Sequence, residues 1–94
     1  MCRNITELRG LQPPATAEEI SAAARQYIRK VSGLGKVPAT AEVVFEDAVR
    51  EVAEITTRLL ESLPDRRQPP PTVPPLRRPE VQARIAAKAA AAKA

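Results

Sequence analysis

The chain has 94 residues, of which 44% are apolar, and it carries a formal net charge of +4. This length allows one small domain, and a single cysteine without any histidine excludes an internal disulfide and a zinc site built from Cys and His ligands. Because its aromatic residues are Tyr27 and Phe45 alone, the chain has little capacity to stack nucleic-acid bases.

Basic charge is concentrated in the last third of the chain. Residues 1–63 hold eight Lys or Arg against nine Asp or Glu, whereas residues 64–94 hold seven against two. Attraction to phosphates or to an acidic protein would therefore act mainly through the C-terminal extension.

No apolar run is long enough to span a membrane, and the first residues lack the apolar region of a signal peptide. We therefore expect a cytoplasmic protein that does not contact membranes. The sequence holds no recognisable metal-ligand set or cofactor motif, so we expect neither a metal nor a cofactor.

The N-terminal segment has the signals of one or two helical turns. Asn4 can cap a helix with Glu7 three residues later, and Gly10 can end it, which predicts a helix over Ile5 to Arg9. The apolar residues here would cover the following helices as a lid. They are Ile5, Leu8 and Leu11.

Residues 16–33 contain the clearest helix signal. Thr16 and Glu19 form a capping box, in which each side chain accepts a hydrogen bond from the backbone amide of the other residue. Gly33 supplies a left-handed C-terminal cap, so the helix is expected to end near Ser32. Its apolar stripe consists of Ile20, Ala23, Ala24, Tyr27, Ile28 and Val31.

The longest helical periodicity runs from Thr40, the expected cap, to Leu63. The short connection at residues 34–39 brings this helix back antiparallel, so the two apolar stripes are expected to face each other. The second stripe consists of Phe45, Ala48, Val49, Val52, Ile55, Leu59, Leu60 and Leu63.

Charged residues of these two helices are expected on solvated faces. Four-residue spacing predicts two ion pairs, Glu46 with Arg50 and Glu54 with Arg58. Neighbouring acids are interpreted as surface residues and not as catalytic pairs. These acids are Glu18 with Glu19 and Asp47 with Glu51.

Pro64 ends the second helix, and residues 64–79 hold seven prolines without any periodicity, which predicts an extended polyproline linker. With Pro79 at the first helical position, residues 80–94 predict a basic Ala-rich helix. Val81 and Ile85 are its large apolar residues, so the helix is expected to be marginal alone and to fold on a partner.

These signals predict an all-α fold. The domains are an antiparallel helical hairpin with its N-terminal segment (1–63), a proline-rich linker (64–79) and a C-terminal Ala/Lys helix (80–94). Two helices bury few large side chains, so the hairpin needs another surface. Either the N-terminal segment and the tail complete a monomeric bundle, or two hairpins pair as a homo-oligomer, and we favour the dimer.

Three separated segments carry a family resemblance: Met1 to Ile5 (MCRNI), Pro13 to Ile20 (PPATAEEI) and Ala24 to Gly33 (ARQYIRKVSG). Together they resemble DUF2277, a family of small bacterial proteins of unknown function. The resemblance covers residues 1–63 and weakens in the proline-rich linker. It implies a compact, helical, bacterial protein, and no activity is established for the family.

Cys2 is a candidate reactive thiol. Removal of Met1 would place it at the N-terminus, as in class II glutamine amidotransferases, whose N-terminal amine serves as the base. Those enzymes need a β-sandwich, and no stretch of this sequence alternates as a strand does. A small apolar residue packed against the hairpin is the simpler interpretation.

The other candidate contacts are basic side chains. Gly33, Gly35 and Lys36 resemble the turn of helix-hairpin-helix DNA binders, but the connection is too long for that motif and Gly33 is already explained as a cap. Phosphate contacts from dispersed basic groups would be salt-sensitive, and a solubilising tail explains the same residues. The candidates for nucleic acid or an acidic partner are Arg25, Arg29, Lys30, Lys36, Arg66, Arg67, Arg77, Arg78, Arg84, Lys88 and Lys93.

We therefore expect a non-enzymatic binding protein whose hairpin associates with itself or with another protein. Its basic tail would contact nucleic acid weakly. The alternative is an adaptor whose tail folds on an acidic protein partner, without any role in nucleic-acid binding.

Overall fold

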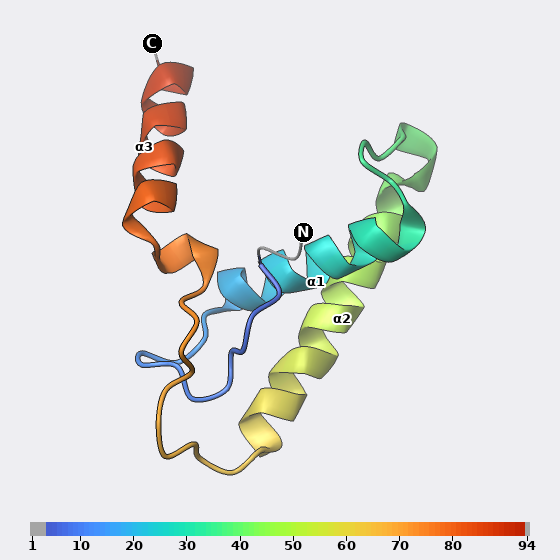
Figure 1. Ribbon diagram of the computed structural model, residues 1–94. Helices are drawn as coiled ribbons and strands as arrows, with labels where there is room; N and C mark the ends of the chain where they lie inside the picture. Colours follow the sequence, from blue (N-terminus) through green and yellow to red (C-terminus); the bar gives the residue numbers. More distant parts are fainter. Residues whose placement is uncertain (1–3, 94) are drawn as a thin grey trace.

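The computed structural model describes residues 4–93, and this part of the chain is all-α, without a strand, as predicted. It contains helices α1 (Ala17–Ser32), α2 (Glu42–Ser62) and α3 (Pro79–Lys93) (Figure 1). Two short 3-10 turns, η1 (Ala39–Ala41) and η2 (Pro75–Arg77), precede α2 and α3.

Helix α1 begins and ends as predicted. The Glu19 amide donates to the Thr16 hydroxyl at 3.1 Å, and the Thr16 amide donates to the Glu19 carboxylate at 2.9 Å, which completes the capping box. At the other end Gly33 has φ +72° and donates its amide to the Arg29 carbonyl at 2.9 Å. Both signals are local, so the sequence alone sufficed to find them.

The predicted cap of α2 is wrong. Thr40 lies inside η1, and α2 begins at Glu42 without a side-chain cap, because the 3-10 turn takes up the first backbone amides. The helix ends at Ser62, and Leu63 is extended at φ −82° and ψ 150°. A residue before proline avoids the helical region, so Pro64 accounts for this end.

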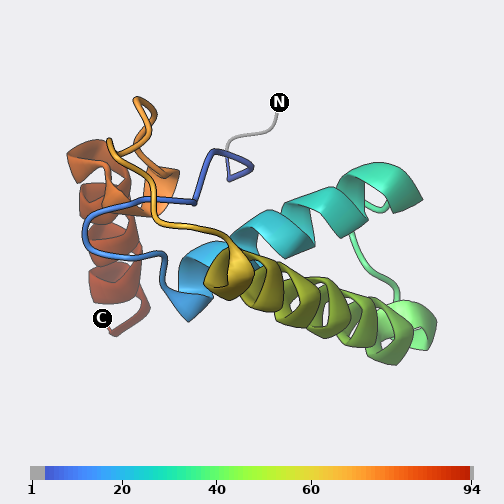
Figure 2. The same cartoon turned by 90° about the horizontal axis from the view of Figure 1, so that it is seen from below.

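The core lies where α1 and α2 cross. The two helices run in opposing senses, and their axes are steeply inclined in both views (Figure 1, Figure 2). Ala24, Phe45 and Val49 are buried together at this crossing. The small side chain of Ala24 allows the helices to approach closely there. Partly buried apolar residues surround this cluster, namely Ile28, Leu34, Val37, Val52 and Ala53.

Part of each predicted stripe does not reach the core. Ile55 and Leu59 of α2 are 59% and 56% exposed, and Leu63 is also exposed. Tyr27 and Val31 of α1 are exposed as well. The two stripes face each other at the crossing, as predicted, but two helices alone do not cover the whole of either stripe.

The predicted helix over Ile5 to Arg9 is not formed. Residues 4–16 contain no helix, and polar groups among them bond to distant parts of the chain. The Asn4 amide donates to the Gln26 side chain, and the Glu7 carboxylate accepts from Arg66. A helix of five residues is unstable alone, so these contacts determine the path of the segment. Leu11 is buried, whereas Ile5 is exposed.

Residues 64–78 return across the N-terminal segment. Pro70, Pro74 and Pro75 are buried there, and η2 interrupts the extended backbone. We call residues 64–78 the strap, because Arg66 and Arg77 bond to residues near the start of the chain.

Helix α3 projects from the rest of the molecule (Figure 1, Figure 2). It begins at Pro79, as predicted, and the Gln82 side chain donates to the Leu76 carbonyl beside it. The radius of gyration is 14.9 Å, compared with about 12 Å for a compact chain of this length. The projecting helix accounts for this extended shape.

Candidate functional site

A clamp of charged groups joins the strap to the start of α1. The Arg77 guanidinium donates to both oxygens of the Glu19 carboxylate, at 2.6 and 2.9 Å. Its Nη2 also donates to the carbonyls of Pro13 and Pro14, at 2.8 and 3.1 Å. Glu19 is only 5% exposed, so its interpretation as a surface acid is wrong. The sequence indicated that Glu19 caps α1, but it did not indicate the ion pair with Arg77, 58 residues away.

The clamp changes the protonation equilibrium of Glu19. Hydrogen bonds from Arg77 lower the pKa of the Glu19 carboxyl; burial opposes this effect, and the Thr16 amide adds to it. The same bonds raise the pKa of Arg77. The pair is therefore held in its charged state, which strengthens both hydrogen bonds.

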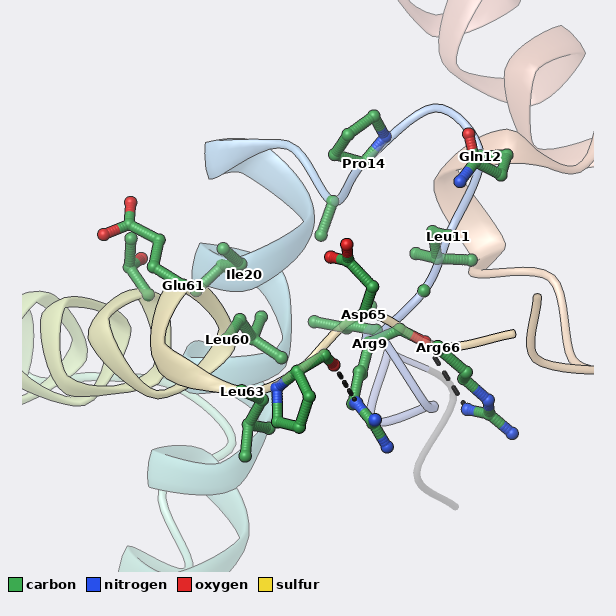
Figure 3. A pocket seen from close by; sticks show the side chains of 15 residues that line it. Arg9, Leu11, Gln12, Pro14, Ile20, Leu60, Glu61, Leu63, Asp65 and Arg66 are labelled. Carbon is green, nitrogen blue, oxygen red and sulfur yellow. Dashed lines mark hydrogen bonds between the residues drawn. The ribbon is translucent and has the colours of Figure 1, made fainter. Parts of the chain in front are cut away.

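A second set of bonds joins the strap to the turn at Gly10. The Arg9 side chain donates to the Pro64 carbonyl at 3.1 Å, and Arg66 donates to the Arg9 carbonyl at 3.4 Å (Figure 3). Arg66 also pairs with Glu7 at 3.1 Å. Gly10 has φ +84°, and a Cβ there would lie 2.7 Å from the Arg66 Cβ. This position therefore has no room for a side chain.

These segments enclose an open cleft of about 730 Å³ between the N-terminal segment, the start of α1 and the end of α2 (Figure 3). Large aliphatic side chains line it, namely Leu8, Leu11, Ile20, Leu60 and Leu63. Four charged side chains also line it, namely Arg9, Glu61, Asp65 and Arg66. An apolar surface with charges of both signs can hold an amphipathic group.

Three of the polar groups that line the cleft are engaged in the fold. Arg9 and Arg66 bond to backbone carbonyls, and the Thr57 hydroxyl donates to the Ala53 carbonyl at 2.8 Å. Such groups hold the walls of the cleft in place. No local spacing pairs Arg9 with the strap, so the sequence did not predict this cleft.

Arg25 joins α1 to α2 on one side of the crossing. Its guanidinium forms two bonds to Glu46, at 2.7 and 2.6 Å, and lies 5.7 Å from the centre of the Phe45 ring. The hydrogen bond from Arg25 lowers the pKa of Glu46. The predicted pair of Glu46 with Arg50 is therefore wrong, because Glu46 pairs across the two helices.

Arg50 has other partners along α2. It pairs with Asp47 at 3.0 Å and with Glu54 at 3.7 Å. The predicted pair of Glu54 with Arg58 is not formed, since Glu54 is bonded to the residue one turn earlier. These exposed pairs add little to stability.

An apolar row lies exposed on α2. We call Ile55, Leu59 and Leu63 the α2 row: their four-residue spacing places Ile55 and Leu59 on one side of the helix, and Leu63 is the extended residue that follows it. Their exposed fractions are 59%, 56% and 39%. Isolated apolar residues are common on surfaces, but three in one row are typical of a contact surface.

The predicted basic contacts fall into two groups. Four of them are engaged: Arg25 with Glu46, Arg66 with Glu7, Arg77 with Glu19, and Arg78 with the Val73 carbonyl. Six make no side-chain hydrogen bond or ion pair within the described residues, namely Arg29, Lys30, Lys36, Arg67, Arg84 and Lys88.

The six unengaged basic residues do not form one patch. Arg29 and Lys30 lie at the end of α1 and Lys36 in the loop after it, Arg67 lies in the strap, and the other two lie on α3. The loop and α3 are at opposite ends of the molecule in both views (Figure 1, Figure 2). Cys2 and the side chain of Lys93 lie outside the described residues.

Within residues 4–93, no cluster of three or more His, Cys, Asp or Glu could hold a metal ion. None of the helices described is long and apolar enough to cross a membrane.

The fold and its surfaces define a small helical-hairpin protein closed by a proline-rich strap. Residues 1–84 match the family described as "Uncharacterized conserved protein (DUF2277)", so the chain belongs to DUF2277, as its sequence indicated. This match includes the strap and the start of α3. Comparisons with curated proteins and with solved structures found no significant match.

Proposed function

We propose that this protein is a non-enzymatic association module whose α2 row binds another protein chain. The exposure of Ile55 and Leu59, on a helix whose Phe45 and Val49 form the core, supports this proposal. Burying such a row against a second protein removes apolar surface from water, which is a main source of affinity between proteins.

The cleft supports binding rather than catalysis. Its guanidinium groups hold backbone carbonyls, and its Thr57 hydroxyl is committed to α2. A nucleophile needs an adjacent base within hydrogen-bonding reach, whereas the arrangement around Thr57 supplies a backbone acceptor. We therefore assign the cleft a role in binding and not in catalysis.

Substitution of Leu59 by Lys tests this function. Leu59→Lys should abolish association, because a charge in the α2 row would have to be buried without a partner. The matched control is Val43→Lys, since Val43 is also an exposed apolar residue of α2, at 73% exposure, but lies outside the row. Light scattering and capture of proteins from a host-cell lysate measure association. Equal behaviour of both variants and the wild type would contradict the proposal.

A weak contact with nucleic acid is a second candidate function. It is supported by Arg84 and Lys88, which are one turn apart on α3 and make no ion pair within the described residues. Binding of the full chain to duplex DNA should appear at about 50 mM salt and disappear at about 200 mM. The double variant Arg84→Glu with Lys88→Glu should not bind. Absence of binding by the wild type at low salt would exclude this candidate.

A further inference from the structure

Helix α3 lacks a covering surface. It has 15 residues, and its large apolar side chains are Val81 and Ile85. Ile85 is 47% exposed, and the neighbour of α3 is the short turn η2. Isolated helices of this length are marginal in water, and most helix stability in proteins comes from packing of an apolar face. A stable α3 therefore needs a second surface.

The α2 row is complementary in shape to the apolar side of α3. It consists of large side chains, whereas α3 offers Val81 and Ile85 one turn apart, followed by alanines. Alanine side chains allow two helix axes to approach closely, so large residues of one helix can fill the space above small residues of the other.

The charges of the two helices are also complementary. Helix α2 carries six acidic residues and two basic ones, whereas α3 carries three basic residues and one acidic one. Glu51 precedes Ile55 by one turn and therefore continues the α2 row. It makes no side-chain hydrogen bond or ion pair within the described residues, as is also true of Arg84 and Lys88.

The α3 helix of the same chain is not placed to cover the row. The Glu19–Arg77 clamp fixes the chain two residues before α3 begins, at the start of α1. From this point α3 extends away from α2 in both views (Figure 1, Figure 2). The clamp does not restrict how α3 of a second copy approaches the row. A two-fold arrangement of two copies would cover both rows at once.

We propose that two copies of this chain form a symmetric dimer in which α3 of each copy lies along the α2 row of the other. This inference rests on the proposed function, because it names the chain that the α2 row binds. Arg84 and Lys88 then face the acidic side of α2, and Ile85 contacts the row.

Site-specific cross-linking tests the dimer. Two variants of the full chain are made in a Cys2→Ser background, one with Leu59→Cys and one with Ile85→Cys. Under mild oxidation the mixture should give a disulfide-linked dimer that contains one copy of each variant. The control replaces Leu59→Cys by Val43→Cys and should give far less product. Equal cross-linking in the test and the control would overturn the dimer.

A second measurement separates this inference from the proposed function. Light scattering should show that the double variant Arg84→Glu with Lys88→Glu dimerises about tenfold more weakly than the wild type. If that variant still dimerises fully while Leu59→Lys is monomeric, the α2 row associates without α3 and only the inference fails. If Leu59→Lys does not change association at all, the proposed function fails as well.

Discussion

Glu19 has two roles in this fold, and the sequence indicates only the first. Its carboxylate caps α1 through Thr16 and also holds Arg77 of the strap. The capping box spans three residues, so its pattern is readable locally. The bond to Arg77 spans 58 residues and depends on the path of the strap, which no spacing along the chain encodes.

Loss of the clamp should destabilise the fold. Arg77→Ala leaves a nearly buried carboxylate without its cation, so the free energy of unfolding should fall by about 2 kcal/mol. Glu19→Gln keeps an oxygen for the cap and should cost less. Urea unfolding measures both, with Arg67→Ala as the control because Arg67 is exposed and makes no ion pair within the described residues. An equal effect of Arg77→Ala and the control would contradict the role of the clamp.

The lowered pKa of Glu19 predicts a dependence of stability on pH. Because the folded chain favours the carboxylate, the stabilisation is fully present above the ordinary pKa of 4.5. It is lost as the pH falls through the lower pKa of the folded state. Between about pH 7 and about pH 3, the wild type should therefore lose more stability than Glu19→Gln. Parallel losses in thermal unfolding of the two proteins would contradict this prediction.

Gly10 and Gly33 share a positive φ but differ in their surroundings. A Cβ at Gly10 would lie 2.7 Å from Arg66, whereas none of the neighbours of Gly33 is within 4 Å of such an atom. Gly33→Ala should therefore cost only the backbone strain, about 1 kcal/mol, and Gly10→Ala should cost clearly more because the strap must also shift. Chemical denaturation of both variants measures the difference, and equal costs would exclude close packing at Gly10.

At the scale of elements, periodicity predicted which residues of α2 are apolar but not how far along the helix they are buried. Burial depends on the angle at which α1 packs on α2 and on which side of α2 faces α1. Phe45 and Val49 lie at this contact, whereas Ile55 and Leu59 lie outside it on the exposed side of α2. The strength of the apolar pattern is the same in both places, so the sequence alone could not separate core from contact surface.

Truncation of single side chains along α2 should distinguish core residues from surface residues by their effect on stability. Val49→Ala removes two buried methyl groups and should lower the free energy of unfolding by about 2 kcal/mol. Ile55→Ala, at a position that is 59% exposed, should change the free energy of unfolding of the monomer by about 0.5 kcal/mol or less. Unfolding at low protein concentration, where association is weak, provides the comparison. A large loss from Ile55→Ala would show that the row is part of the core.

At the scale of the whole molecule, the hairpin, the N-terminal segment and the strap close the fold together. The three long helices were predictable, as were both ends of α1, the end of α2 and the start of α3, because caps, prolines and periodicity are local. The path of residues 4–15 and 64–78 was not, since it depends on arginines that bond to residues far away in the sequence. The same long-range bonds form the cleft. The sequence therefore indicated neither the path of these two segments nor the cleft.

The most direct test of this account compares two shortened chains that both lack α3, residues 1–78 and residues 1–63. Urea unfolding should show a cooperative transition for residues 1–78. Residues 1–63 should be several kcal/mol less stable or unfolded, because Arg66, Arg77 and the buried prolines are absent. Equal stability of the two chains would contradict the central claim that the strap is part of the folded core structure.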